Sequence, residues 1–60
     1  MSDVERIMLE CRYVLSLNKS YQELSKLMHI NIDIIYDDLN NKLKSIDSIL
    51  YKRTQNCLKK

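Results

Sequence analysis

Residues 20–39, SYQELSKLMHINIDIIYDDL, hold the start signals of two helices a few residues apart. Ser20 and Glu23 have the spacing of a capping box, in which each side chain hydrogen bonds a backbone N–H at the start of a helix. Asn31 is a preferred N-cap for a second helix. Because the second signal follows so soon after the first, the first helix must be short and the turn between the two must be tight.

Apolar residues follow both start signals at helical spacing. Leu24, Leu27 and Met28 give the first helix one apolar face, and Ile35 and Leu39 keep the second helix packed on it. Two short helices joined in this way are typical of a helix-turn-helix unit, whose second helix enters the major groove of DNA. The segment therefore predicts a helix-turn-helix.

The turn between these helices carries the only histidine of the chain. His29 follows the last apolar residue of the first helix, and histidine enters the left-handed region of backbone conformation more readily than most non-glycine residues. We therefore expect a positive φ at His29. After it, Ile30 and Ile35 occupy the two positions of a hydrophobic staple around the Asn31 cap.

No pattern in the sequence indicates catalysis or a bound metal. His29 has no metal-ligand partner at helical spacing. Asp37 and Asp38 have no glycine loop or further ligand set beside them, as a calcium or magnesium site would require. No side-chain nucleophile is paired with a base. We expect a protein that is not an enzyme and that binds no metal or cofactor.

The chain of 60 residues contains no glycine or proline, so its turns must rest on Asn, Asp, Ser and Lys. A chain this short buries only about 60% of its unfolded surface, which favours a small helical core with local contacts. The sequence predicts one all-α domain spanning residues 1–60, with about four helices that include the helix-turn-helix. The expected spans are residues 3–17, 21–28, 32–43 and 48–58, with breaks at 18–19 and 44–47.

Apolar residues at helical spacing define the expected buried faces of the first and last helices. On the last helix we expect Thr54 to face inward, together with Ile49 or Leu50 and with Cys57 or Leu58. The expected buried stripe of the first helix consists of Val4, Ile7, Met8, Cys11, Val14 and Leu15.

The positive charge lies in the C-terminal third of the chain. The net charge is +2, but residues 1–41 carry four basic side chains against seven acidic ones. Two interpretations of the basic end stay open: a solvated helix face whose charge complements the helix dipole, or an edge that contacts phosphate. From residue 42 onward Asp47 is the one acid, and the basic residues are Lys42, Lys44, Lys52, Arg53, Lys59 and Lys60.

The two cysteines, Cys11 and Cys57, lack the spacing of a metal or redox motif. We expect no signal peptide before them, and no apolar run approaches membrane-spanning length. We expect free thiols in a reducing cytoplasm, with Cys11 in the hydrophobic core, and no membrane partner.

Several short motifs stand in a fixed order and spacing along the chain, from about Val4 to Leu58. They are Tyr13-Val14-Leu15, Ser20-Tyr21, Met28-His29-Ile30-Asn31, Ile35, Asp38-Leu39, Lys42-Leu43, Ile46-Asp47 and Leu50. In this register the chain resembles the stage III sporulation protein D family, small helix-turn-helix transcriptional regulators of endospore-forming Firmicutes. The resemblance implies a role in sporulation and a monomer-sized DNA-binding fold. In that fold the third helix enters the major groove and the basic C-terminal region contacts the phosphate backbone.

The chain departs from the pattern of that family at three places. His29 stands where the family has glycine. Ile32 and Asp37 stand where the family has lysines, so the polar, basic reading face is lost. Beyond the last helix, only Lys59 and Lys60 represent the family's basic tail. The resemblance therefore implies a divergent and shortened relative with a less basic DNA-binding surface.

The leading hypothesis is a sequence-specific DNA-binding transcriptional regulator. Asparagine amides pair with adenine and Ile32 contacts a thymine methyl, while the lysines and Arg53 hold the phosphate backbone of double-stranded DNA. The expected DNA-binding residues are Asn31, Ile32, Asp33, Tyr36, Asn40, Lys42, Lys44, Lys52 and Arg53.

The alternative hypothesis is a degenerate helix-turn-helix that acts as a protein–protein interaction or dimerisation module without DNA binding. Ile32, Ile34 and Tyr36, with the acidic neighbours Asp33 and Asp37, suit an interface better than a phosphate surface. The partner would be another copy of the chain, polymerase or a basic regulator.

Overall fold

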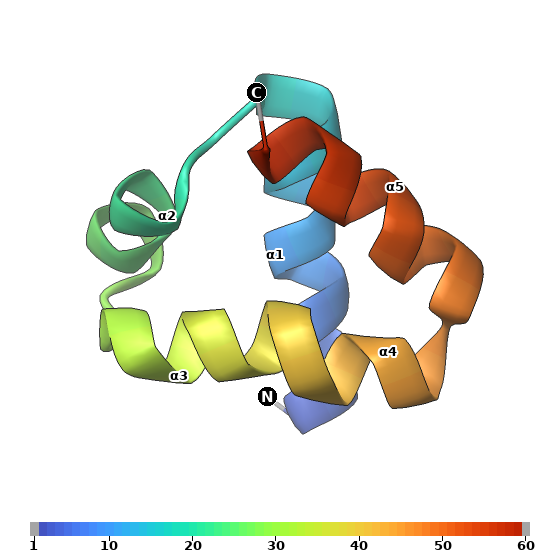
Figure 1. The fold of residues 1–60 in the computed structure, drawn as a ribbon. Helices are drawn as coiled ribbons and strands as arrows, with labels where there is room; N and C mark the ends of the chain where they lie inside the picture. The colour runs from blue at the N-terminus through green and yellow to red at the C-terminus, as the bar shows by residue number, and fades with distance from the viewer. Residues whose placement is uncertain (1, 60) are drawn as a thin grey trace.

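The computed structural model describes residues 2–59, and these residues are helical with no strand (Figure 1). The elements are α1 (Asp3–Leu17), α2 (Tyr21–Met28), α3 (Ile32–Asp37), the π-helical η1 (Asp38–Lys42), α4 (Leu43–Ile46) and α5 (Ser48–Leu58). Because α3, η1 and α4 follow one another without a break, they form a single long helix. The predicted all-α fold of four helices is thus confirmed for the described part of the chain; Lys60 lies outside it.

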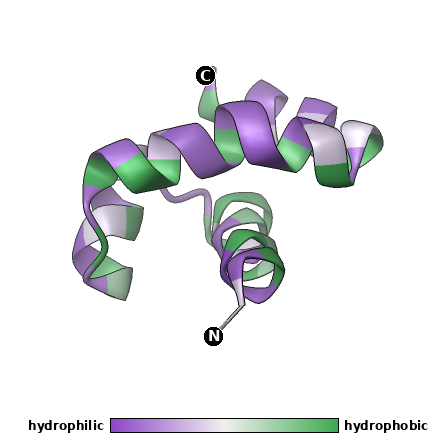
Figure 2. Cartoon of the chain, turned by 90° about the horizontal axis from the view of Figure 1, so that it is seen from below, coloured by the Kyte–Doolittle hydropathy of each residue, from purple (hydrophilic) through white to green (hydrophobic). Residues whose placement is uncertain are grey.

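The long helix α3–η1–α4 runs along the bottom of Figure 1, and the other helices pack around it. α2 contacts α3, α1 crosses behind and contacts η1, and α5 folds back from α4 to contact both η1 and α1. Figure 2, seen from below, shows the long helix lying across one side of the molecule with α1 end-on beside it. Both α1 and α5 therefore pack against η1, the middle of the long helix.

The predicted helix starts are confirmed by side-chain caps. The Ser20 hydroxyl accepts from the Glu23 N–H at 3.3 Å, and the Glu23 carboxylate accepts from the Ser20 N–H at 3.0 Å, which completes the capping box. Asn31 Oδ1 accepts from the Asp33 N–H at 2.8 Å at the start of α3. Asp47 caps α5 in the same way. These polar side chains supply the punctuation that glycine and proline give in other chains.

Two helices end on a residue in the left-handed conformation. His29 has φ 56°, as predicted, and Asn18, at the end of α1, also has φ 56°. The turn after His29 is fixed further, because the Ser25 hydroxyl donates to the Ile30 carbonyl oxygen at 2.6 Å. The left-handed conformation costs a non-glycine residue roughly 1–2 kcal/mol, so the surrounding bonds must hold it in place.

The third predicted helix is longer than expected. It continues past Leu43 to Ile46, and the expected break at 44–47 shrinks to Asp47 alone. Neither a glycine nor a proline stops it, and buried Leu43 ties its continuation to the core. The helix accommodates this length with a wider turn at η1, where the Leu43 N–H donates to the Asp38 carbonyl oxygen, five residues back.

The hydrophobic core joins all of the helices. At its edge the expected burial of Val4 is wrong, since Val4 is 50% exposed, and Leu27, on the expected apolar face of α2, is 47% exposed. On α5 the inward position belongs to Leu50, next to fully buried Thr54. Because the core is small, the neighbouring helices cover only part of the apolar stripes of α1 and α2. The buried core consists of Ile7, Cys11, Val14, Leu24, Ile35, Leu39 and Leu43.

The capping box at Ser20 gives a direct test of this architecture. Ser20→Ala removes the acceptor for the Glu23 N–H and is expected to lower the free energy of unfolding by about 1 kcal/mol. Urea denaturation followed by circular dichroism measures the change. Ser16→Ala is the matched control, because Ser16 is exposed inside α1 and caps nothing. Equal effects of the two substitutions would contradict a stabilising cap at Ser20.

Candidate nucleic-acid interface

The outward face of α3 is apolar and acidic. Ile32, Ile34 and Tyr36 are 37%, 46% and 56% exposed, and Asp33 and Asp37 are exposed beside them. No lysine or arginine occurs between residues 27 and 41. The sequence-based expectation of an unusually uncharged or negative reading face therefore holds for the folded chain.

Asn31 and Tyr36 keep polar groups at the solvent-exposed surface. Asn31 uses its Oδ1 atom to cap α3, while its Nδ2 group makes no hydrogen bond within residues 2–59. The Tyr36 ring lies against the Tyr21 ring of α2, with centroids 5.1 Å apart and an interplanar angle of 40°. This aromatic pair fixes the position of Tyr36 relative to α2.

Asn40 lies in an internal hydrogen-bond network rather than on the open surface. Its Nδ2 group donates to the Tyr21 hydroxyl at 2.9 Å and to the Tyr36 carbonyl oxygen at 2.7 Å. Its Oδ1 atom accepts from Gln55 Nε2 at 3.2 Å, and Gln55 Nε2 also donates to the Leu39 carbonyl oxygen at 3.0 Å. The amide of Asn40 thus connects α2, α3 and α5, and its hydrogen-bonding groups are occupied.

A lysine that the sequence did not single out lies next to the start of α3. A shallow groove of about 370 Å³ is lined by Gln22, Ser25 and Lys26 of α2 and by Ile32 of α3. Lys26 therefore brings a positive charge beside the N-terminal end of α3, whose first turn carries Asp33 and no basic residue. From sequence alone this neighbour is hidden, because the contact depends on the angle between the two helices.

The predicted basic residues have different surroundings. Lys42 is engaged by carboxylates, with its Nζ atom 3.7 Å from Asp38 and 3.9 Å from Asp3. Lys44 is exposed and its Nζ atom lies 5.9 Å from the centre of the Tyr51 ring, a cation–π distance. Of the two, Lys44 has the more available charge.

Lys52 and Arg53 are adjacent exposed residues of α5, about 100° apart around the helix. Lys52 lies one turn before Gln55, the residue that hydrogen bonds to η1, so it flanks the long helix. Arg53 lies one turn before Cys57, which borders a groove with Asn18, Lys19, Ser20 and Leu58. Helical periodicity therefore puts Lys52 closer than Arg53 to the side of α5 that carries Gln55.

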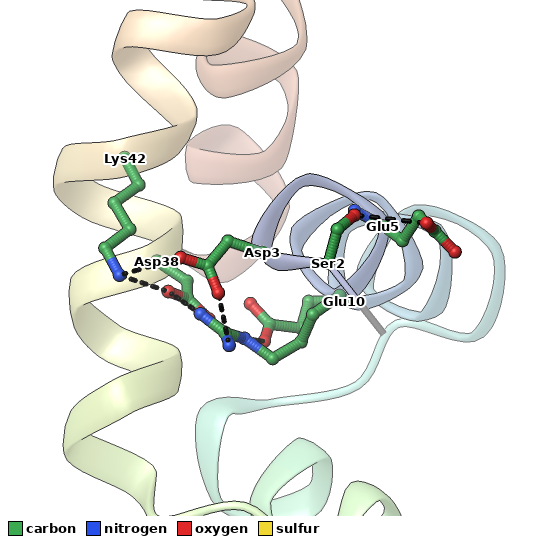
Figure 3. Close-up of polar contacts among 7 residues, drawn as sticks. Ser2, Asp3, Glu5, Glu10, Asp38 and Lys42 are labelled. Atoms are coloured by element: carbon green, nitrogen blue, oxygen red, sulfur yellow. Dashed lines mark hydrogen bonds and ion pairs between the residues drawn. The ribbon is translucent and has the colours of Figure 1, made fainter.

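A buried ion cluster holds α1 against η1 (Figure 3). The Arg6 guanidinium donates to both oxygens of Asp38, at 2.8 and 2.9 Å, and to Asp3 at 3.0 Å. Asp38 and Glu10 are both fully buried. Lys42 approaches Asp38 from the same helix. The bidentate Arg6–Asp38 pair has the geometry of the strongest charge-assisted hydrogen bonds.

Glu10 is buried in this cluster without a donor from the described residues. Arg6 Nε lies 3.7 Å from its nearer oxygen, too far for a hydrogen bond. The cluster contains three acids, Asp3, Glu10 and Asp38, against two bases, Arg6 and Lys42, so full ionisation leaves one negative charge uncompensated. Burial, followed by a hydrogen bond with Asp38 and the charge of that carboxylate, raises the pKa of Glu10 to about 9. The raised pKa favours the protonated form of Glu10 in the folded chain.

Asp38 stays ionised beside it. Burial acts to raise the pKa of Asp38, but hydrogen bonds from Arg6 and Glu10 together outweigh burial and lower it. The same bond with Asp38 raises the pKa of Arg6 further above neutrality. A proton on Glu10 balances the charge of the cluster, because two ionised acids, Asp3 and Asp38, then face two bases, Arg6 and Lys42.

Within residues 2–59, no three His, Cys, Asp or Glu side chains are arranged to hold a metal ion. Cys11 is buried and Cys57 half-buried, both as free thiols, and burial raises the pKa of Cys11. Across the same residues, no helix combines the length and the apolarity that crossing a membrane requires.

Comparison with the models of known protein families, with curated proteins and with solved structures finds no match to this chain.

Proposed function

We propose that this chain is a sequence-specific DNA-binding transcriptional regulator of the small helix-turn-helix type, acting in the cytoplasm. In this proposal α2, the turn at His29 and α3 form the helix-turn-helix, and the exposed start of α3 contacts base edges. The observation that carries it is the exposed Asn31 and Tyr36 on a helix whose position is fixed by caps and by the Tyr21–Tyr36 pair. The resemblance to the stage III sporulation protein D family supports it and suggests sporulation as the regulated process.

Base contacts come from the first turns of α3. The Asn31 amide suits adenine, and Ile32 suits a thymine methyl group. Tyr36 offers a hydroxyl from the same face. Asn40 acts differently in this proposal: because its amide is occupied, it positions Tyr36 and leaves the reading of bases to its neighbours.

Phosphate contacts come from both sides of α3. Lys26 flanks the start of the helix, while Lys44 and Lys52 lie toward its other end. Asp33 and Asp37 repel phosphate between them. Few cations and two opposing carboxylates make the electrostatic contribution small, so we propose weak nonspecific affinity and a shallow dependence on salt.

A fluorescence-anisotropy titration with mixed-sequence duplex DNA at several salt concentrations tests this proposal. Binding is expected at low salt, with a log–log slope of roughly −0.9 for each phosphate contact. Lys26→Ala and Lys52→Ala should each weaken binding to every duplex and reduce the slope by about one contact. Arg53→Ala is the matched control on α5 and should have the smaller effect. Asp37→Lys should strengthen binding and steepen the slope.

Two outcomes together would exclude DNA binding: no duplex bound at low salt by the wild-type chain, and none bound by Asp37→Lys. Sequence preference is tested separately with selected duplex pools. Asn31→Asp keeps the cap acceptor at α3 but replaces the amide donor with a second acceptor. It should change the preferred sequence while the helical content of the protein stays the same.

The exposed apolar face of α3 favours a second candidate, a protein-interaction module without DNA binding. Ile32 and Tyr36 lie one turn apart on one flank of the exposed side of α3, Ile34 lies on the other flank, and Asp33 and Asp37 lie between them. Exposed apolar side chains with acidic neighbours suit a binding surface for a basic or apolar partner. If DNA binding is absent, Ile34→Asp is the test variant. This candidate predicts that the substitution abolishes any self-association or partner binding that wild type shows in sedimentation.

A further inference from the structure

The outer face of α1 carries an apolar groove that the fold leaves uncovered. The groove has a volume of about 330 Å³ and is lined by Val4, Glu5, Met8, Leu9 and Arg12. Val4 is half exposed, and Met8 and Leu9 are only partly buried. An apolar strip bordered by two opposite charges is the arrangement of an interface core with a polar rim.

The two charges at the ends of the groove cannot satisfy each other within one chain. Glu5 and Arg12 are seven residues apart, which is two helical turns or roughly 10 Å along the axis. Arg12 makes no ion pair within residues 2–59, and the Glu5 carboxylate accepts only from the Ser2 hydroxyl, at 3.1 Å. Each charge is therefore available to a partner.

The order of these residues is self-complementary. If a second α1 lies antiparallel across the groove on a two-fold axis between residues 8 and 9, then residue i meets residue 17 − i of the other copy. Glu5 then faces the partner's Arg12, and Arg12 faces the partner's Glu5. Met8 and Leu9 face the partner's Leu9 and Met8 in the centre, where charges are absent. We propose that the α1 groove binds a second copy of this chain in this antiparallel arrangement.

This dimer leaves the candidate DNA-binding surface free, because none of the groove residues belongs to α2 or α3. A single pair of crossing helices buries less than the roughly 1,200 Å² that marks a stable complex. The association is therefore weak and reversible, and the two ion pairs at its rim make it sensitive to salt.

Sedimentation equilibrium of the wild-type chain, from about 10 µM to 1 mM, measures this association. Glu5→Arg and Arg12→Glu each place two like-charged pairs in the interface and should weaken dimerisation at least tenfold. An equimolar mixture of the two variants should restore it, since both rim pairs become complementary in the mixed dimer. The double variant Glu5→Arg/Arg12→Glu should also dimerise like wild type. Circular dichroism confirms that each variant keeps its helical content.

Three results would overturn the proposal: a monomeric wild type at the highest concentration, single reversals that leave dimerisation unchanged, or a mixture that fails to restore it. Ile34→Asp separates this surface from the apolar face of α3. Ile34→Asp should leave dimerisation unchanged. If this variant no longer dimerised, the contact between the two copies would lie on α3 instead.

Discussion

Replacing Arg6 with methionine is expected to remove most of the folding stability of the domain. The substitution keeps the aliphatic part of the side chain but leaves the buried Asp38 carboxylate without its two hydrogen bonds from the guanidinium. Breaking a buried pair from one side typically costs about 3–5 kcal/mol. A 60-residue domain has a total stability of roughly 3–9 kcal/mol, so a largely unfolded population is the expected outcome at 37 °C.

The matched control is Arg12→Met, the same substitution two turns further along α1. Arg12 is exposed and unpaired within the described chain, so its replacement should change stability by no more than about 0.5 kcal/mol. Urea or thermal unfolding followed by circular dichroism measures both. Similar unfolding free energies for the two variants would show that the Arg6–Asp38 pair does not hold α1 against η1.

The second large effect concerns pH. Glu10 has its pKa raised from 4.5 to about 9 by burial, so the folded chain keeps a proton that the unfolded chain has released at neutral pH. Between these two values the native state binds more protons than the unfolded state, and stability must therefore fall as pH rises, by up to about 1.4 kcal/mol per pH unit. Asp38 acts in the opposite sense at low pH. Its lowered pKa contributes stability above the unfolded value of 3.8, and that contribution is lost as pH falls.

Glu10→Gln tests this directly. The glutamine amide donates to Asp38 as a protonated Glu10 carboxyl does. The variant has no carboxyl to protonate on folding, so it avoids the free-energy cost of binding a proton at neutral pH. The variant should be more stable than wild type at pH 7 by on the order of 1–3 kcal/mol, and its stability should vary less between pH 5 and 9. Glu5→Gln, an exposed change on the same helix, should leave the wild-type slope in place. An unchanged pH profile in Glu10→Gln would mean that Glu10 is ionised when buried.

The helix starts and turns could be predicted because their causes are local. Ser20 with Glu23, Asn31 and Asp47 act on backbone groups two or three residues away, so spacing in the sequence is sufficient. The positive φ of His29 also follows from its place between two strong helix signals. By contrast, the end of the third helix depended on the burial of Leu43 in the core, which no local signal reports.

The ion cluster could not be predicted because its partners are distant in sequence. Arg6 and Asp38 are 32 residues apart, and nothing near either residue points to the other. One signal was present: Glu10 follows Ile7 by three residues and precedes Val14 by four, which places an acid on the buried stripe of α1. An acid at such a position needs a partner, so a buried polar contact could have been expected there, although not its identity.

Only part of the candidate site could be predicted from the sequence. The exposed face of α3, which lacks lysine and arginine, followed from helical periodicity, and Asn31 was correctly placed as a cap. The internal role of Asn40 and the proximity of Lys26 to Ile32 depend on how α2 and α5 cross the long helix. Crossing angles arise from the packing of whole helix surfaces, so single residues do not reveal them.

The wide turn at η1 lets the long helix hold one extra residue. Ile35, Leu39 and Leu43 are all fully buried at intervals of four residues, whereas a regular α-helix advances about 100° per residue and carries such a row gradually around its axis. The π-helical turn at Asp38–Lys42 corrects that drift. Because five residues of π-helix turn roughly as far as four residues of α-helix, deleting one exposed residue here is expected to restore a regular helix while Leu43 and everything after it keep nearly the same orientation. A further inserted residue is expected to turn Leu43 away from the core.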